Sequence, residues 1–316
     1  MNGSLWLPSR WQKPKSMVIF SNMEKGQRES WRIALSCPDK RGVVAKVSAC
    51  LAELGATILE AQQHSDEVSG HFFMRYEVTQ DETDSRASLW PEHHLEHGLA
   101  DLKRELQLDM RISSLADKPR VALLASKASH CLVDVLQRWR SGELPCDIAC
   151  VIANHPEMGE YAGWYDVPFH HVDFKGQSKA AAFKEVDALL DGHGVSLTVL
   201  ARFMQIIPPA LIDKHPRRII NIHHSFLPSF IGARPYDQAF ARGVKLIGAT
   251  CHYVTADLDE GPIIEQEVIR VSHTDTPADL RRKGRMCERE ALGRGLRLHL
   301  EDRVFVHGNK TVVFAD

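Results

Sequence analysis

The chain has 316 residues, a length that favours two domains. With 44% hydrophobic and 25% charged residues, its composition is that of a folded globular protein and excludes a disordered or fibrous chain. Lys and Arg number 39 and Asp and Glu 41, and the net charge of −2 gives no overall attraction to nucleic acid or to an anionic membrane. We expect neither as a partner. Charged and proline residues interrupt the most apolar stretch, 195–212, so we expect no membrane span.

The seven cysteines indicate a reducing compartment. They form no C-x-x-C pair, so we expect buried, reduced thiols and a cytoplasmic protein. Residues 1–28 are basic, but their apolar core at 17–20 is too short for a signal peptide. We expect a disordered extension or a start assigned too early, with a transit peptide as the weaker alternative.

The first block of predicted elements runs in the order β-α-β-β-α-β. Val43, Val47 and Leu51 repeat at helical spacing after a turn at 38–42, and Gly55 ends that helix. The predicted strands are 31–37, 56–63, 71–80 and 110–115, and the predicted helices are 42–54 and 91–106. This order is the ferredoxin-like arrangement, so we predict such a domain over 29–115 and a linker over 116–120.

The second block, 121–316, alternates strands with helices. Near-continuous apolar strands at 121–125, 147–153, 197–203 and 219–223 predict a mostly parallel α/β sheet covered by helices. The intervening predicted helices are 129–139, 179–190 and 208–214. Strands at 245–255 and 262–271 predict an antiparallel addition. A long helix from Thr276 to about Leu300 and a short terminal pair of strands follow.

Asn221 and His223 are the first candidate functional residues. Side chains on a strand alternate, so both point the same way, about 6.6 Å apart, while Ile220 and Ile222 point into the helical layer. At the carboxyl end of a parallel strand, an amide and an imidazole can donate two hydrogen bonds to one oxygen and stabilise an oxyanion. The alternative is that the two side chains only satisfy each other.

A second candidate is the acidic loop within 252–264. Asp257, Asp259 and Glu260 lie between two apolar strands, where a carboxylate can reach a histidine and raise its affinity for a proton. The alternative is an exposed acidic hairpin loop.

The segments 200–207 (LARFMQII), 221–228 (NIHHSFLP) and 252–264 resemble the three signature segments of folate-dependent formyltransferases. This resemblance covers the second block and implies the catalytic set Asn221, His223 and Asp259 in the pattern N-x-H … L-D-x-G. It also implies that the pteridine ring of the folate lies against the backbone around 203–207 and 254–259. The residues implied there are Phe203, Met204, Gln205, Ile206, Ile207, Val254 and Asp257.

The first block resembles an ACT domain through the turn Pro38-Asp39-x-x-Gly42. The resemblance implies an amino-acid effector near Asp39, Gly42 and Thr57, although Thr57 stands where such domains often have Asn. The alternative is a pure dimerisation module. We expect a homo-oligomer, a dimer or a tetramer, because the edge of such a small sheet invites side-by-side pairing.

An ACT domain followed by a formyltransferase domain resembles the formyltetrahydrofolate deformylase family. That resemblance implies hydrolysis of 10-formyltetrahydrofolate to formate and tetrahydrofolate, which supplies formate for purine synthesis and balances one-carbon folate pools. We expect no permanently bound cofactor and no metal.

The segment after the strand 121–125 bears on the acceptor. Glycinamide ribonucleotide formyltransferases, which the second block also resembles, carry a Gly- and Asn-rich phosphate loop at this place. Residues 125–131 contain no glycine, so the resemblance implies no binding site for a phosphorylated amine and water as the expected acceptor. Lys127 and His130 either line the water side or simply begin a surface helix. His252 is expected beside the catalytic set, and His224 in the turn or facing away from His223. The alternatives are a formyltransferase acting on an amine and an inactive amino-acid-binding protein.

Overall fold

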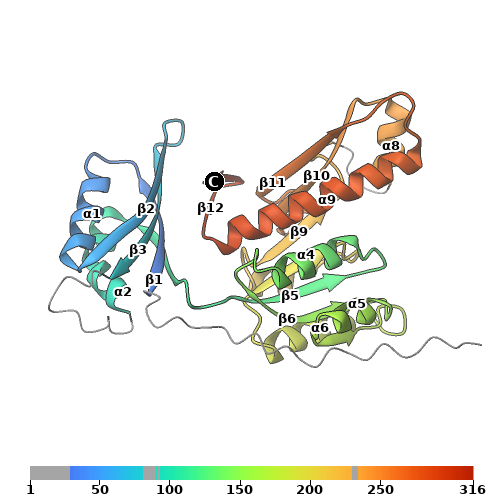
Figure 1. Ribbon diagram of the computed structural model, residues 1–316, viewed down its shortest axis with the longest axis horizontal. Coiled ribbons are helices and arrows are strands. Elements are labelled where there is room, and N and C mark those ends of the chain that lie inside the picture. Colours follow the sequence, from blue (N-terminus) through green and yellow to red (C-terminus); the bar gives the residue numbers. More distant parts are fainter. Residues whose placement is uncertain (1–28, 81–89, 91–92, 230–233, 316) are drawn as a thin grey trace, which may run out of the picture.

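The computed structural model describes residues 29–80, 90, 93–229 and 234–315 (Figure 1). The predicted extension, 1–28, lies outside the described residues. The described strands form a four-stranded sheet, a seven-stranded sheet and a two-stranded hairpin. Within the described residues, no helix combines the length and apolarity that a membrane crossing requires.

The first domain is the predicted ferredoxin-like unit. Its strands are β1 (Ser30–Pro38), β2 (Ala56–Asp66), β3 (His71–Gln80) and β4 (Asp109–Ser114), antiparallel in the order β2-β3-β1-β4. Helices α1 (Val43–Glu53), α2 (His94–Gly98) and α3 (Ala100–Leu106) cover one face. The single helix predicted over 91–106 is therefore wrong in detail. It divides at Leu99, where Gly98 packs so closely on Leu54 that a β-carbon would overlap that side chain.

The alternation of side chains along this sheet separates two apolar layers. Ile33, Leu35 and Met74 pack under the helices, whereas Ala34 and Phe73 face the other way and contact Phe305. Phe305 belongs to the terminal hairpin of β12 (Val304–His307) and β13 (Lys310–Val313). The hairpin of the second domain thus covers the second face of the first sheet.

The seven-stranded sheet of the second domain has the order β11-β10-β9-β8-β5-β6-β7. Its strands are β5 (Arg120–Ala125), β6 (Asp147–Ala153), β7 (Phe169–His171), β8 (Leu197–Ala201), β9 (Ile219–His223), β10 (Leu246–Tyr253) and β11 (Ile263–Arg270). The strands from β9 to β7 are parallel, and β10 and β11 form the predicted antiparallel addition.

Helices cover both faces of this sheet. One face carries α4 (His130–Arg140), α5 (Met158–Trp164) and α9 (Pro277–Leu300), and the other carries α6 (Lys179–Gly192) and α7 (Pro209–Lys214). In Figure 1, α9 (red) runs beside β9, β10 and β11. The capping box of Thr276 and Asp279 starts this helix, as the sequence indicates.

Three elements of the second domain were not expected from the sequence: α5, β7 and α8 (Pro235–Arg242). All seven cysteines lie in the described part of the chain and are free, six buried and Cys50 half-buried, which confirms the expected buried thiols.

Arginines of the first sheet bind the carboxyl end of α9. Arg32 Nη1 donates to the carbonyl of Leu300 (3.1 Å), and Arg75 Nε donates to the carbonyl of Glu301 (3.0 Å). Arg75 is only 1% exposed and also pairs with Glu60 at 2.8 Å. These bonds satisfy carbonyls that a helix end leaves without intrahelical partners, so the two domains share a buried polar contact.

Candidate active site

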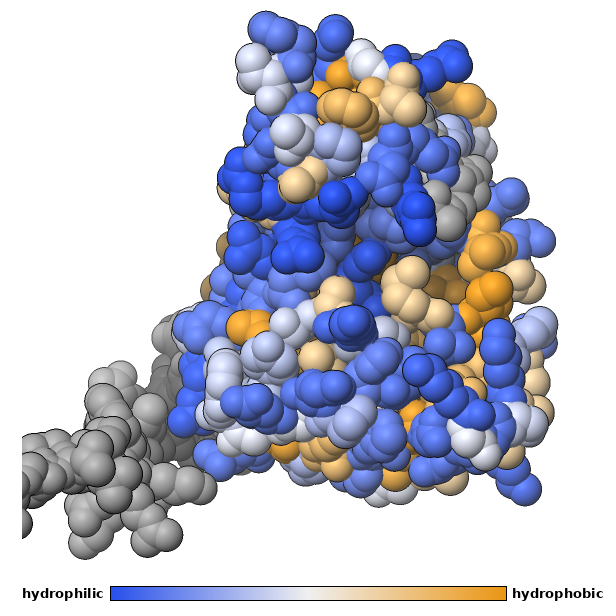
Figure 2. All heavy atoms as spheres, turned by 90° about the vertical axis from the view of Figure 1, so that its right-hand side faces the viewer, coloured by the Kyte–Doolittle hydropathy of each residue, from blue (hydrophilic) through white to orange (hydrophobic). Residues whose placement is uncertain are grey.

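The chain order of the parallel strands reverses between β5 and β8, and open α/β sheets bind ligands at such a switch point. A cavity of about 420 Å³ opens at this carboxyl edge, a volume that suits a small organic ligand. Its lining includes 202–207 after β8, Asn221 and His223 of β9, and 254–256 and 258–259 after β10. Figure 2 looks onto this end of the sheet, where apolar residues interrupt a hydrophilic surface.

Asn221 and His223 lie on β9 as the alternation predicts. Ile220 and Ile222 point away from them, into the core under α4 and α9. His223 is 5% exposed and lines the cavity, with Nδ1 3.2 Å from Asp259 Oδ1. Its Nε2 is buried and has no hydrogen-bond partner among the described residues. A buried imidazole nitrogen without a partner at a cavity wall is a position for a ligand atom.

Asp259 reaches His223 from the loop between β10 and β11. Gly261 allows this loop to fold back, because a β-carbon there would overlap the backbone carbonyl of Tyr253. Burial by itself raises the pKa of Asp259, but the hydrogen bond with His223 and the charges of nearby histidines outweigh it, so the pKa lies below its usual value. Asp259 is therefore ionised at neutral pH and can accept a hydrogen bond from Nδ1 of His223.

His252, on β10, lies directly opposite Asn221 in the sheet. Its Nε2 is 3.1 Å from Asn221 Nδ2, and its Nδ1 is 2.9 Å from the carbonyl of Tyr253. Burial lowers the pKa of His252 and outweighs the Tyr253 carbonyl and Asp259, which raise it. His252 is therefore neutral at neutral pH, and it lies beside Asn221 and Asp259, next to the candidate residues as the sequence predicts.

The residues expected at the pteridine ring largely meet at this cavity. All of 203–207 and Val254 line it. Met204, Ile206 and Leu258 are each more than half exposed at its rim, where they group apolar surface at the opening of the cavity. Asp257 is exposed and does not belong to the lining. Its carbonyl accepts hydrogen bonds within the loop from Thr255 and Glu260.

The residues expected at the effector site do not meet within one chain. Gly42 has φ of +89°, the left-handed conformation that glycine adopts freely, and begins α1. Asp39 follows β1, whose last residue pairs with His71 at the start of β3, whereas Thr57 pairs with Thr79 near the end of β3. Eight residues of strand separate these pairings by roughly 27 Å.

A buried cluster that the sequence did not indicate lies beside the cavity. Glu288 of α9 accepts hydrogen bonds from His130 Nε2 (2.7 Å) and Tyr236 Oη (2.7 Å), and its Oε2 lies 3.2 Å from Arg202 Nε. Burial raises the pKa of Glu288, but His130 and Arg202 outweigh it, so the carboxyl is ionised at neutral pH. His130 therefore joins a buried network, whereas Lys127 is exposed.

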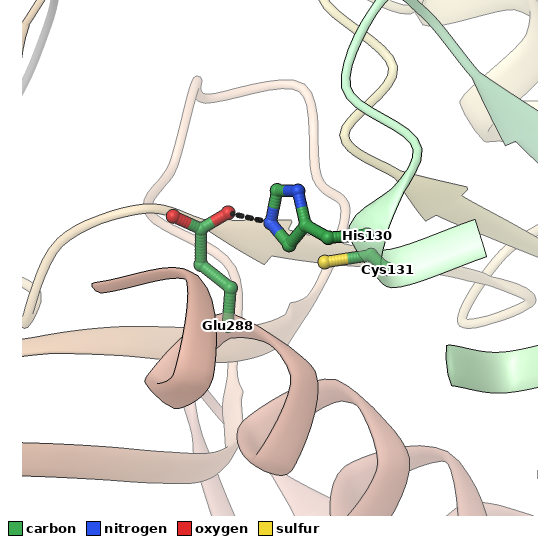
Figure 3. Close-up of side chains that lie close together, drawn as sticks. All are labelled: His130, Cys131 and Glu288. Carbon is green, nitrogen blue, oxygen red and sulfur yellow. Dashed lines mark hydrogen bonds and ion pairs between the residues drawn. The ribbon is translucent and has the colours of Figure 1, made fainter. Parts of the chain in front are cut away.

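His130, Cys131 and Glu288 offer ligand atoms within 4.8 Å of one another. Figure 3 shows these three side chains, with the hydrogen bond between His130 and Glu288. A cation there would compete with the guanidinium of Arg202, which already contacts the same Glu288 oxygen as His130. Nearby, His224 lies in the bend after β9 with its ring 5.2 Å from that of His223. Burial, and next the charge of Arg202, lower the pKa of His224 to about 4.

Comparisons with known proteins agree with this geometry. A formyl transferase family model matches residues 119–296, and an ACT domain model matches 31–87. The fold and site thus define an enzyme of the formyltransferase class with an N-terminal ACT domain.

A formyltetrahydrofolate deformylase of Bacillus subtilis is 44% identical over 92% of this chain and 95% of its own. A crystal structure of a formyltetrahydrofolate deformylase from Pseudomonas syringae is 50% identical, with a TM-score of 0.86 over 93% of this chain and 97% of that one. The chain belongs to the formyltetrahydrofolate deformylase family.

The second domain alone has further structural relatives. Glycinamide ribonucleotide transformylase 1 from Symbiobacterium toebii is 33% identical, with a TM-score of 0.60 over 63% of this chain and 95% of that one. The same fold therefore occurs in proteins whose names specify a different acceptor.

Proposed function

We propose that the cavity binds 10-formyltetrahydrofolate and that Asn221, His223 and Asp259 catalyse its hydrolysis. The observation that carries this proposal is the partnerless Nε2 of His223, which lines the cavity while Nδ1 contacts Asp259. Protonated at both nitrogens, His223 donates to Asp259 on one side and to the substrate on the other.

In the proposed reaction, water attacks the formyl carbon and gives a tetrahedral intermediate. The amide of Asn221 and the Nε2–H of His223 stabilise its oxyanion, while Asp259 holds the imidazolium. The bond between the formyl carbon and N10 then breaks. N10 takes the Nε2 proton of His223, and the attacking water returns a proton to His223. The products are tetrahydrofolate and formic acid, which loses its remaining proton to solvent and leaves as formate. No permanently bound cofactor or metal takes part in this scheme.

The test is formate release from 10-formyltetrahydrofolate by the purified protein without any amine. His223→Ala removes an oxyanion donor, so we expect turnover to fall by about 10²–10³. The exposed His171, on β7, provides a matched His171→Ala control that should keep wild-type turnover. If His223→Ala released formate at the wild-type rate, the catalytic assignment would be wrong. Folate binding with no turnover under any condition would instead favour an inactive binding protein.

We also propose that the first domain binds an amino acid between two copies of the chain. β2 is an edge strand, and its Ile58 and Leu59 are 37% and 55% exposed. Antiparallel pairing of two β2 edges brings the turn at 39–42 of one copy toward Thr57 of the partner subunit, which removes the separation found within one chain.

Leu59→Lys tests this pairing, because it adds a charge to the edge. We expect the variant to be smaller than the wild type in sedimentation and to lose any response of formate release to free amino acids. A response that persisted in a monomeric variant would contradict an effector site between subunits. In the cell, we propose a cytoplasmic enzyme whose formate serves purine synthesis and whose activity balances folate pools.

A further inference from the structure

At the switch point between β5 and β8, a hydrogen bond joins the two loops that follow these strands. The loops that follow these two strands meet there, where Met204 N–H donates to Ser126 Oγ (3.0 Å). Beside this bridge, Arg202 leaves β8, His130 begins α4, and both contact Glu288 of α9. The position where an open α/β sheet has room for a ligand is thus partly filled by a buried ion pair.

Glu288 holds Arg202 at the wall of the cavity. The carboxylate is 1% exposed and has partners from three other segments: Arg202, His130 and Tyr236. Losing one partner of such a buried charge leaves the other uncompensated, so the network resists movement of the guanidinium. The side chain of Arg202 is 15% exposed and lines the cavity together with Asn221 and His223.

The backbone of Arg202 adds an independent observation. Its φ is +65°, a left-handed conformation that glycine adopts freely and that other residues adopt at a cost of about 1 kcal/mol or more. Glycine would adopt this positive φ without backbone strain. A long side chain at such a position, directly beside a candidate active site, indicates a role for the side chain itself.

We propose that Arg202, held by Glu288, closes the acceptor side of the catalytic cavity and so restricts the formyl acceptor to water. This inference rests on the proposed hydrolysis of 10-formyltetrahydrofolate. Proteins named glycinamide ribonucleotide transformylase share the fold of the second domain, so the fold alone does not select the acceptor. Side chains beside His223 must do so, and water needs far less room than an amine to reach the formyl carbon.

Arg202→Gly tests the proposal, because it relieves the backbone conformation and removes the side chain. The assay mixes 10-formyltetrahydrofolate with glycinamide, a small primary amine, and measures formate and N-formylglycinamide together. In the transfer reaction the amine nitrogen attacks the formyl carbon, the bond to N10 breaks, and one amine proton moves to N10. The matched control is Arg217→Gly, since Arg217 has a similar φ of +59° and is exposed outside the cavity.

We expect the wild type and Arg217→Gly to give formate with only a trace of N-formylglycinamide, which sets the reference ratio. Arg202→Gly should raise the ratio of N-formylglycinamide to formate by roughly tenfold or more. Glu288→Gln, which keeps the shape but removes the charge that holds Arg202, should raise the ratio in the same direction. Both products come from the same active sites, so the ratio does not depend on how much of a variant is folded.

Formate release without any formylated amine from both variants would overturn the role of Arg202 and leave the hydrolysis intact. Efficient formylation of the amine by the wild type would overturn it too. A wild type that releases no formate would instead refute the proposed function. If Arg202→Gly does not fold, the result for Glu288→Gln decides the question.

Discussion

The amide nitrogen of Asn221 lies 3.1 Å from Nε2 of His252, and this contact assigns the tautomer of the ring. Nδ1 of His252 faces the carbonyl of Tyr253 at 2.9 Å and must donate, so in the neutral ring Nε2 accepts from Asn221. This hydrogen bond fixes the Asn221 side chain with its amide nitrogen toward His252. The orientation of the amide beside His223 is set by the neighbouring strand.

His252→Phe removes both hydrogen bonds while keeping an aromatic ring. Because the Asn221 amide loses its partner, we expect kcat for formate release to fall by about tenfold or more, with a smaller change in KM. His252→Gln, whose oxygen can still accept from Asn221, should recover part of that loss. Equal kcat in the phenylalanine variant and the wild type would show that this hydrogen bond does not orient the amide.

Asp259→Asn keeps the size of the side chain but removes its charge. The asparagine no longer stabilises a protonated His223, so we expect formate release to fall by about 10² or more at neutral pH. The neighbouring exposed Asp257, which lies outside the cavity lining, provides the control Asp257→Asn. Comparable losses in both variants would indicate a general effect of loop charge.

Gly261→Ala should damage the loop that carries Asp259. The added methyl overlaps the backbone carbonyl of Tyr253, which cannot rotate away, so we expect the free energy of unfolding to fall by about 1–3 kcal/mol. Formate release should fall as well, because the loop must shift. Gly163→Ala in α5 is the control: its methyl meets nothing within 4 Å, and helix propensity favours alanine. Urea unfolding of both variants measures the difference.

His299 should make the fold sensitive to acid. Burial, and next the charge of Arg111, lower the pKa of His299 to about 3, whereas an unfolded histidine titrates near 6.5. Between these values the unfolded chain binds a proton that the folded chain does not, so the free energy of unfolding falls as the pH falls. The contribution is at most about 1.4 kcal/mol per pH unit.

His299→Gln removes this titration and can still accept from the hydroxyl of Tyr253, which lies 2.7 Å from His299 Nδ1. We therefore expect a shallower loss of stability between about pH 6 and pH 4 than in the wild type. Urea unfolding at several pH values checks this, and an unchanged slope would locate the acid sensitivity elsewhere.

The parts of the fold that depend on local pattern could be predicted from the sequence. β9 was predicted with its observed bounds, Ile219–His223, because its apolar residues are continuous and the next residues turn. The elements that were missed depend on neighbours. β7 has only three residues and exists because it pairs with β6, and α5 contains two glycines, which weaken any helical signal.

The cluster around Glu288 could not be found by spacing, since its partners lie 52 to 158 residues away in the chain. One signal was available. Glu288 falls between Gly284 and Leu292 at helical spacing, within the stripe of α9 that packs against the core. A carboxylate on that stripe needs a buried partner, but only the tertiary structure shows which residues are its partners.

The arginines that bind the carboxyl end of α9 make this helix the connection between the first sheet and the cluster around Glu288. Glu288 stands twelve residues before Leu300, about 18 Å along a rod that cannot shorten without breaking hydrogen bonds. Arg32 and Arg75 of the first sheet donate hydrogen bonds to carbonyls at the carboxyl end of this helix. One continuous helix therefore carries both the contact with the first domain and the carboxylate that holds Arg202 beside the cavity.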